Sequence, residues 1–564
     1  MFKFFIFLIF IILCCVFGGG RVQAQERVYD SPLPLPMLLS GSFGELRETH
    51  FHSGIDLKTG GKVGIPVISM KEGIVSRVKV SSVGYGRALY VEHADGTTTV
   101  YAHLLRYTPE VNRIVREKQY ERESFEVDLN MRAYGIVFQS GDTLAFTGNT
   151  GSSGGPHLHF EYRDTHTEAV LNPLLFLEIQ DNMPPKIQAL YIYYMAEDGC
   201  VERKRRIVPK YLGNRKYACG KITVPAGRNG VGFYLTDLMN GSWNKLGIYR
   251  MEMSVDGEKR FEMVVDTCLF DSNPWVNEIK DFDLYRQKHE TVYRTFGHYM
   301  DRIPGVKIAD EGWVDMNKGE EKQGCVKVAD KNGNEVEFCF TLIAKDSIPF
   351  RKRKVLDYKK PNVVGEEGYN LLLGDSVLSA SLPYVGKVDT MILADGKLYT
   401  VFVVSQREQP LLKPARLEVK GSFDERAVVC RITDKRMLVD MTTQQCENGI
   451  IAMPYFLGCY TVVSDTVSPE VKYLGMSGRK LKFIIRDELT GIAAYRGEVN
   501  GKWGLFEYDA KNDQLTCRVD EPVFVRGRNE VRVMVCDKAG NVTEKQIVFQ
   551  LGNEINGNKD GKKN

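Results

Sequence analysis

The chain has 564 residues, of which 26% are charged, and a formal net charge of +3 at pH 7. One hydrophobic core does not extend over such a length, so the sequence predicts two to four domains. The nearly balanced charge gives no argument for nucleic-acid binding, and we expect no nucleic-acid partner.

The first 24 residues have the pattern of a secretory signal peptide. Lys3 precedes an unbroken apolar run from Phe4 to Phe17, and Val22-Gln23-Ala24 fits a small-residue cleavage site. A membrane anchor is the alternative, but the run is shorter than the roughly 20 residues of a bilayer span. No later segment is apolar over such a length. We therefore expect a mature chain that begins at Gln25, has no transmembrane segment and works outside the cytoplasm.

Residues 25–180 are predicted to form an antiparallel β domain. Short β-branched runs separated by glycine predict strands, and these cover residues 67–70, 73–78, 88–93, 98–103 and 144–146. Ala94-Asp95-Gly96 predicts a hairpin turn between two of them. Residues 105–135 break the pattern with a charged segment typical of a helix (109–122) and an alternating segment typical of a strand (124–129). We interpret them as an inserted flap on the rim of the site.

Beyond the linker signal Asp181–Pro185, the chain repeats itself. Phe233–Asp237 resembles Phe483–Asp487, and Asp330–Asn334 resembles Asp537–Asn541. Each copy consists of short strands and turns, which predicts Ig-like β-sandwiches at 184–345 and 464–552. We also expect a β-rich middle domain at 346–463 and a disordered tail at 553–564. The predicted fold class is mainly β.

Two side issues concern metals and disulfides. The alternation Asp330-x-Asn332-x-Asn334 is reminiscent of a calcium loop, but no glutamate follows at the required spacing, so we predict a hairpin turn.

No cysteine lies between residues 25 and 180, which argues against a cysteine-ligated zinc site. The even number of cysteines elsewhere leaves two alternatives, disulfides and buried free thiols.

Most histidines lie in the first predicted domain. The chain has nine, and seven fall before residue 170: His50, His52, His93, His103, His157, His159 and His166. In a strand over residues 157–161, His157 and His159 share one face, while Leu158 and Phe160 point into a core.

A second histidine group can complete a metal site with that pair. His52 and Asp56 are four residues apart, and Gly54 lets the backbone turn between them. With one histidine of the 157/159 pair they give two imidazoles and a carboxylate, the ligand number of a catalytic zinc site that keeps one position open. His103, at the end of a predicted strand, is a further candidate for the centre.

Three blocks carry a resemblance to a known family. They are His52-Ser53-Gly54-Ile55-Asp56, Tyr101-Ala102-His103-Leu104 and Gly155-Pro156-His157-Leu158-His159-Phe160-Glu161. Their order and separation resemble those of the LytM/lysostaphin-type zinc metallopeptidases, the M23 peptidoglycan endopeptidases. The resemblance covers residues 41–176, and the segment 105–135 departs from it by its length.

The resemblance implies zinc held by His52, Asp56 and His159. It implies that His103 and His157 act on the water and on the developing oxyanion. It further implies a secreted enzyme that hydrolyses peptide bonds in peptidoglycan, in the periplasm or cell envelope. The alternative is a non-catalytic regulator or binding protein on the same fold, and in either case the C-terminal β domains are candidates to bind cell wall or a protein partner.

Other polar residues near these blocks receive lesser roles. We expect His50 at the rim of the site, and His93 and His166 in solvent. For Glu161 and Arg47 two alternatives stay open: partners of the metal ligands, or members of ordinary surface salt bridges. The glycine-rich loop Gly148–Gly155 lacks the Lys-Ser/Thr ending of a phosphate-binding loop and leads into a strand, so we expect no nucleotide.

Overall fold

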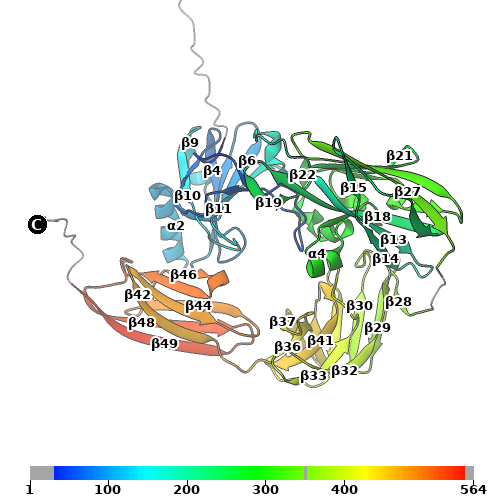
Figure 1. Cartoon of the computed structure of the whole chain (residues 1–564). Coiled ribbons are helices and arrows are strands. Elements are labelled where there is room, and N and C mark those ends of the chain that lie inside the picture. The colour runs from blue at the N-terminus through cyan, green and yellow to red at the C-terminus, as the bar shows by residue number, and fades with distance from the viewer. Residues whose placement is uncertain (1–30, 349–351, 553–564) are drawn as a thin grey trace, which may run out of the picture.

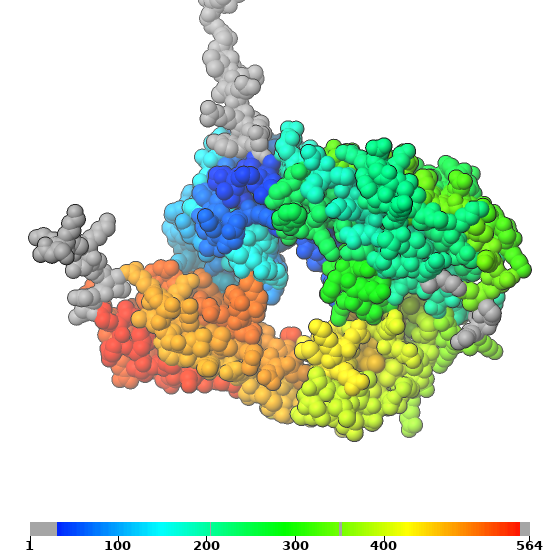
Figure 2. Space-filling view, in the orientation of Figure 1, coloured from blue at the N-terminus to red at the C-terminus, as the bar shows by residue number. Residues whose placement is uncertain are grey.

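The computed structural model describes residues 31–348 and 352–552. The predicted signal peptide and the predicted disordered tail lie outside these ranges. The chain is mainly β and forms four groups of strands arranged in a ring, in which the last group returns to the first (Figure 1). The space-filling view shows an opening at the centre of the ring (Figure 2).

The first group of strands, the peptidase unit (residues 31–180), is built on one large and one small antiparallel sheet. The large sheet has the order β1 (Leu39–Gly41), β2 (Ile55–Lys58), β11 (His157–Asp164), β6 (Thr97–Ala102), β5 (Arg87–Glu92), β4 (Gly73–Val80), β8 (Val127–Asn130), with β9 (Val137–Phe138) on β4 and β12 (Val170–Leu171) on β11. The small sheet has the order β3 (Pro66–Ile68), β10 (Thr143–Thr147), β7 (Leu104–Tyr107). The predicted strands and the hairpin turn between β5 and β6 are confirmed.

The segment predicted as a flap contains the helix α2 (Pro109–Glu121). Proline at its first position suits a helix start, because the missing N–H has no partner there anyway. Val111, Ile114 and Val115 follow helical spacing and are buried in the core beneath it. The helix and the strand β8 confirm the predicted elements, and the outer face of α2 meets the last group of strands (Figure 1).

The second group, the first sandwich, has two sheets that face each other across Phe233 and Phe338. One has the order β14 (Val201–Ile207), β13 (Lys186–Met195), β18 (Gly227–Met239), β19 (Ser242–Leu246), with β23 (Val292–Arg294) and β25 (Val314–Met316) on β18. The other has the order β15 (Lys210–Gly213), β16 (Lys216–Ala218), β27 (Glu335–Lys345), β26 (Glu321–Ala329), β20 (Arg250–Val255), β21 (Glu258–Val264), β24 (Val306–Ile308), with β17 (Ile222–Pro225) on β27.

Two details of this sandwich answer open questions from the sequence. β26 and β27 pair as an antiparallel hairpin, so the turn predicted at 330–334 is confirmed. Cys325 and Cys339 lie opposite each other in that hairpin and form a disulfide. The other cysteines of the described ranges are free thiols.

The third and fourth groups are also pairs of sheets. In the middle group the orders are β29 (Asn362–Glu366), β30 (Tyr369–Leu373), β35 (Arg416–Lys420), β39 (Gly449–Ala452), β38 (Thr443–Cys446), and β32 (Lys387–Ile392), β33 (Leu398–Val403), β41 (Cys459–Ser464), β36 (Ala427–Ile432), β37 (Leu438–Asp440). In the last sandwich they are β42 (Glu470–Ser477), β43 (Lys480–Arg486), β47 (Gln514–Arg518), β46 (Phe506–Asp509), and β45 (Lys502–Trp503), β44 (Ile492–Val499), β48 (Gly527–Asp537), β49 (Val542–Leu551). The division of the chain into domains at the predicted boundaries stays our proposal.

The peptidase unit and the first sandwich share one core. Buried apolar residues of both, among them Phe51 and Ile279, belong to a single continuous cluster. The strand β12 pairs with β22 (Thr267–Cys268), which follows β21 in the first sandwich. The short helix α3 (Val276–Ile279) precedes α4 (Phe282–Lys288), which lies beside the ring opening (Figure 1). No helix in the described ranges is long and apolar enough to span a bilayer.

Candidate metal centre

Pairing between β2 and β11 brings the two histidine blocks together. His159 lies opposite Asp56 in this antiparallel pair, and opposite Ala102 of β6 on its other side. Leu158 and Phe160 are fully buried in the core, as the alternation predicts. The register therefore places the ring of His159 beside the carboxylate of Asp56.

Three imidazole nitrogens surround one oxygen of Asp56. Its Oδ1 lies 2.9 Å from His159 Nδ1, 3.2 Å from His52 Nε2 and 3.3 Å from His157 Nε2. The ligand atoms of His52, Asp56 and His159 all lie within 4.8 Å of one another. One cation can reach all three.

Hydrogen bonds on the far side of each ring fix its orientation. His52 Nδ1 donates to the carbonyl of Ser42 at 2.7 Å, which leaves Nε2 with its lone pair inward. His159 Nε2 donates to Glu161 Oε1 at 2.8 Å, which turns Nδ1 inward. Metal-binding histidines are held in this way by acceptors behind them.

Glu161 is itself buried and saturated with donors. Ser53 Oγ and Tyr85 Oη each donate to Glu161 Oε1 at 2.6 Å, and Arg163 Nε donates to Oε2 at 2.7 Å. The surface salt bridge that the sequence left open for Glu161 is excluded, because its side chain is fully buried.

His103 and His157 lie beside the cluster with a different attachment. His103 Nδ1 donates to the carbonyl of Thr150, and His157 Nδ1 donates to the carbonyl of Gly155, both at 2.8 Å. These bonds leave Nε2 of His103 as the free nitrogen of its ring, whereas Nε2 of His157 lies 3.3 Å from Asp56 Oδ1. The two ring centres are 4.8 Å apart. His103 has a φ of 58°, where the chain turns from β6 into β7.

Burial and neighbouring charges set the protonation of the cluster. Burial lowers the pKa of His103 to about 3, helped by the adjacent His159 and His157, so this ring is neutral at neutral pH. Burial alone would raise the pKa of Asp56, but the imidazoles around it lower it well below its usual range. Burial also opposes the charge on His159, yet hydrogen bonds to Asp56 and Glu161 raise its pKa to about 9. A metal has to displace that proton at neutral pH.

Gly54 is required by the close approach of β11. A Cβ at this position would lie 2.5 Å from the carbonyl oxygen of Phe160 and 2.9 Å from His159 Cε1. The glycine between His52 and Asp56 thus allows the backbone of the first block to lie against the ring of His159.

The remaining predicted residues divide into confirmed and wrong expectations. His50 and His166 are exposed. His93 was expected in solvent, and this is wrong: the ring is buried, with Nδ1 2.8 Å from the carbonyl of Glu72 and Nε2 2.9 Å from Thr99 Oγ1. These two hydrogen bonds join the end of β5 to the segments that contain Glu72 and Thr99. The predicted turn after His93 did not indicate them.

Residues of the first sandwich support the loop that carries Arg47, and no sequence pattern predicts this support. Arg47 Nη2 lies 3.3 Å from Asp56 Oδ2, so Arg47 is a partner of the candidate ligand. Lys280, which is fully buried at the end of α3, donates to the carbonyls of Arg47 and Glu48. Asn273 Oδ1 accepts from the backbone N–H of Phe51 at 3.1 Å.

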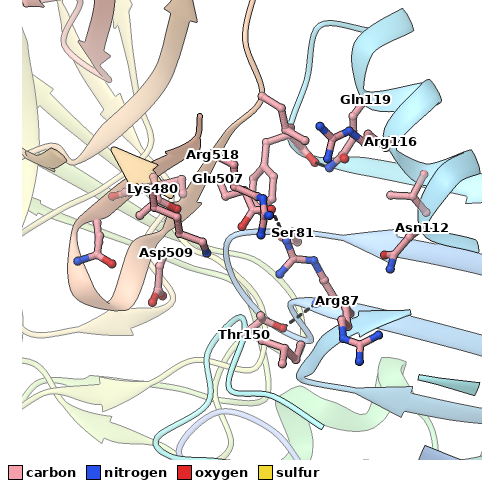
Figure 3. Close-up of a pocket in the computed structure, with 18 of the residues that line it drawn as sticks. Ser81, Arg87, Asn112, Arg116, Gln119, Thr150, Lys480, Glu507, Asp509 and Arg518 are labelled. Atoms are coloured by element: carbon pink, nitrogen blue, oxygen red, sulfur yellow. Dashed lines mark hydrogen bonds and ion pairs between the residues drawn. The ribbon is translucent and has the colours of Figure 1, made fainter. Parts of the chain in front are cut away.

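A separate cleft of about 720 Å³ lies between the peptidase unit and the last sandwich (Figure 3). Arg87 crosses it, with its Nη2 2.9 Å from Glu507 Oε1 and its backbone N–H donating to Thr150 Oγ1 at 3.0 Å. The cleft does not include the histidine cluster. Asn149 and Gly151 of the glycine-rich loop line it, and their carbonyls accept hydrogen bonds from Lys511 of the last sandwich.

Two imidazoles and a carboxylate that can hold a cation, with two further imidazoles beside them, fit the metallopeptidase class. The comparison with known families agrees with this class: residues 50–120 match the sequence model of peptidase family M23. This part of the chain, which contains the candidate ligands His52 and Asp56, is thus similar to peptidase family M23.

Curated relatives match about a quarter of the chain. The DD-carboxypeptidase/endopeptidase Mpg of Neisseria meningitidis serogroup B is 32% identical over 149 residues, which are 26% of this chain and 28% of that protein. An uncharacterized metalloprotease of Haemophilus influenzae is 30% identical over 146 residues, 26% of this chain and 24% of its own length. The matches thus span only about a quarter of the length of these relatives.

Solved structures match over a similar extent. The catalytic domain of lysostaphin from Staphylococcus simulans aligns with 25% of this chain and 91% of its own, at 21% identity and a TM-score of 0.19.

Proposed function

We propose that the protein is a zinc-dependent endopeptidase that hydrolyses peptide bonds in the cross-links or stem peptides of bacterial peptidoglycan. The observation that carries this proposal is the convergence of three imidazole nitrogens on Asp56 Oδ1 within 3.3 Å, with the ring of His103 beside them. His52, Asp56 and His159 would hold the ion, and His103 and His157 would act on the substrate.

The donor set fits zinc. Imidazole nitrogen and carboxylate oxygen are both zinc ligands, and three protein ligands leave a position for water or substrate. Ser42 and Glu161 already orient the two rings, so little rearrangement is required when the ion binds. Zinc, when bound, supplies an acidified water and polarises the scissile carbonyl.

The two remaining imidazoles supply proton transfer. Nδ1 of each ring is held by a backbone carbonyl, so each ring would exchange a proton through its Nε2. One takes a proton from the attacking water and delivers it to the leaving amine, and the other, once protonated, donates a hydrogen bond to the developing oxyanion. The fixed Nδ1 bonds keep both rings oriented through this exchange.

Peptidoglycan as substrate rests on the similarity to family M23 together with the predicted secretion. The name of the Neisseria relative states a carboxypeptidase and an endopeptidase activity. We extend the endopeptidase activity to this chain, in the periplasm or cell envelope, with the C-terminal sandwiches as candidates to bind cell wall or a protein partner.

The direct test is digestion of purified peptidoglycan by the full chain, residues 25–564, with the soluble products identified by mass spectrometry. We expect release of peptide fragments, abolition by a chelator and recovery with zinc. Failure to release peptides from several wall chemotypes, with zinc bound, would support the non-catalytic regulator or binding protein instead.

Paired variants separate the roles of the histidines. We expect His159→Ala to lose both zinc and activity, and His157→Ala to lose activity by at least 100-fold while keeping its zinc. The exposed His166→Ala is the matched control and keeps both. Loss of zinc from His157→Ala, measured by metal analysis, would refute the assignment of ligands.

A further inference from the structure

Three aspartates of the first sandwich lie together where the peptidase unit joins it. Asp181 is in the linker, Asp237 is in β18 and Asp330 begins the turn after β26. Their carboxylate oxygens lie within 4.8 Å of one another. They line a small cavity of about 40 Å³, which Ser42 and Phe43 of the peptidase unit also line.

The charge of this cluster is not balanced by the protein. Among the described residues, no lysine or arginine forms an ion pair with Asp181, Asp237 or Asp330, and the nearby Lys331 lies over the ring of Tyr249 instead. Asp237 is 5% exposed, and its Oδ1 is buried without a hydrogen-bond partner. Leaving such a carboxylate charged in the interior costs several kcal/mol.

The last sandwich contains a second cluster of three aspartates, and in that cluster the central carboxylate has hydrogen-bond partners. Asp465, Asp487 and Asp537 form the second cluster, at the positions that the sequence repeat aligns with the first. Asp487 Oδ2 accepts the backbone N–H groups of three residues of the following loop, Leu489, Thr490 and Gly491. Asp237 lies within the continuous strand β18, where no such loop follows, so it lacks these donors.

An asparagine holds both clusters in the same way. Asn334 Nδ2 donates to Asp330 Oδ2 at 2.7 Å and to the carbonyl of Asp181 at 3.1 Å. Asn541 makes the equivalent bonds to Asp537 Oδ2 and to the carbonyl of Asp465, both at 2.8 Å. The frame of the two clusters is therefore the same, and the difference is confined to what neutralises the central carboxylate.

We propose that Asp181, Asp237 and Asp330 bind a hard divalent cation, specifically calcium, at the junction of the peptidase unit and the first sandwich. Oxygen-only ligands select calcium or magnesium over zinc, and calcium tolerates the irregular geometry of carboxylates drawn from three segments. Burial beside Asp330 and Asp181 also raises the pKa of Asp237 to about 8, as expected for a carboxylate that needs a cation. The site differs from the twelve-residue loop considered from the sequence, since only Asp330 of that stretch takes part.

The bound ion would tie the linker to two strands of the sandwich. The wall of the cavity includes Ser42, whose Oγ accepts from the backbone N–H of Gly247 at 2.8 Å and whose carbonyl accepts from His52 Nδ1. Ser42 thus links the proposed calcium site to the candidate zinc ligand His52. A bound calcium ion would stabilise the junction on which the orientation of His52 depends.

The test uses the full chain with its zinc retained and its calcium removed, and zinc content is checked by metal analysis throughout. We expect calorimetric titration with calcium to show saturable binding, and a saturating concentration to raise Tm by roughly 5 °C. We expect Asp237→Asn to weaken calcium binding at least 10-fold and to be no less stable than the wild type without calcium. Asp487→Asn is the matched control: it keeps the calcium response, although it loses some stability because a neutral amide oxygen is a weaker acceptor for the loop donors than a carboxylate.

Terbium luminescence gives a second measurement on the wild-type chain, independent of whether the variant folds. Tyr249 lines the same cavity and can sensitise a bound terbium ion. We expect a signal that calcium displaces and that Tyr249→Phe diminishes. The proposal is overturned if the wild type shows no saturable calcium binding, if Asp237→Asn responds like the wild type, if Asp487→Asn abolishes the response, or if magnesium acts as strongly as calcium. None of these outcomes depends on peptidase activity.

Discussion

The peptidase unit meets its two neighbours in the ring in different ways. With the first sandwich it shares a continuous apolar core, a strand pair between β12 and β22 and the buried Lys280. With the last sandwich it shares several ion pairs around a cleft and the ring contact of Tyr120 with Trp503. Among the described residues of that sandwich, Trp503 and Leu505 are buried in the same core. Apolar burial is strong and insensitive to salt, whereas exposed ion pairs are weak and screened. We therefore expect the second junction to open more readily than the first.

The largest effect is expected from the shared core. Phe51 is 7% exposed and precedes the candidate ligand His52. Phe51→Ala should destabilise the peptidase unit together with the first sandwich by about 3–5 kcal/mol, measured by denaturant unfolding. Phe483→Ala, fully buried in the separate core of the last sandwich, is the matched control. If both variants lower the midpoint of one common unfolding transition by the same amount, the two junctions do not differ as we describe.

The sequence predicted the histidine cluster because its signal is local. Alternation in β11 and the four-residue spacing of His52 and Asp56 fix which side chains face one another once the strands pair. The hairpins and the helix α2 were predictable for the same reason. Asn273 and Lys280, by contrast, are more than 200 positions from the loop that they support, and no local pattern connects them.

The aspartate clusters were predictable from the sequence only in part. The repeat between Asp330–Asn334 and Asp537–Asn541 was visible in the sequence, and the hairpin turn followed from it. That Asp181 and Asp237 converge on Asp330 depends on how the linker and β18 pack, and the missing loop donors of Asp237 became visible only from comparing the two folded copies.

The next effect in size should come from Lys280. Lys280→Met leaves the carbonyls of Arg47 and Glu48 without their buried donor, which should cost about 1–3 kcal/mol. Burial lowers the pKa of Lys280 from its ordinary 10.5 to about 7. Between these pH values the unfolded chain binds the proton more tightly than the folded one, so the stability of the wild type rises with pH.

The cost of Lys280→Met should therefore be larger at pH 9.5 than at pH 6.5, as measured by urea unfolding at both pH values. The exposed Lys288→Met should show no such pH dependence. A loss of unfolding free energy that is constant across this range, or that falls as pH rises, would contradict a buried and largely neutral amine at the junction with the first sandwich.

The smallest effect is expected at the junction with the last sandwich. Arg496 Nη1 lies 2.7 Å from Glu123 Oε2, and both side chains are more than a third exposed. Arg496→Glu places two like charges against each other, and adding Glu123→Arg restores an opposite pair. We expect a coupling of about 0.5 kcal/mol in this double-mutant cycle, seen as faster amide hydrogen exchange in α2 for the single variant and recovery in the double variant. Because the contact is electrostatic and exposed, the difference should shrink at high salt, while the exchange of β12 and β22 stays unchanged. If the single variant also accelerates amide exchange in β12, the two junctions open together. That result would contradict the expected difference in strength between the junction with the first sandwich and the junction with the last one.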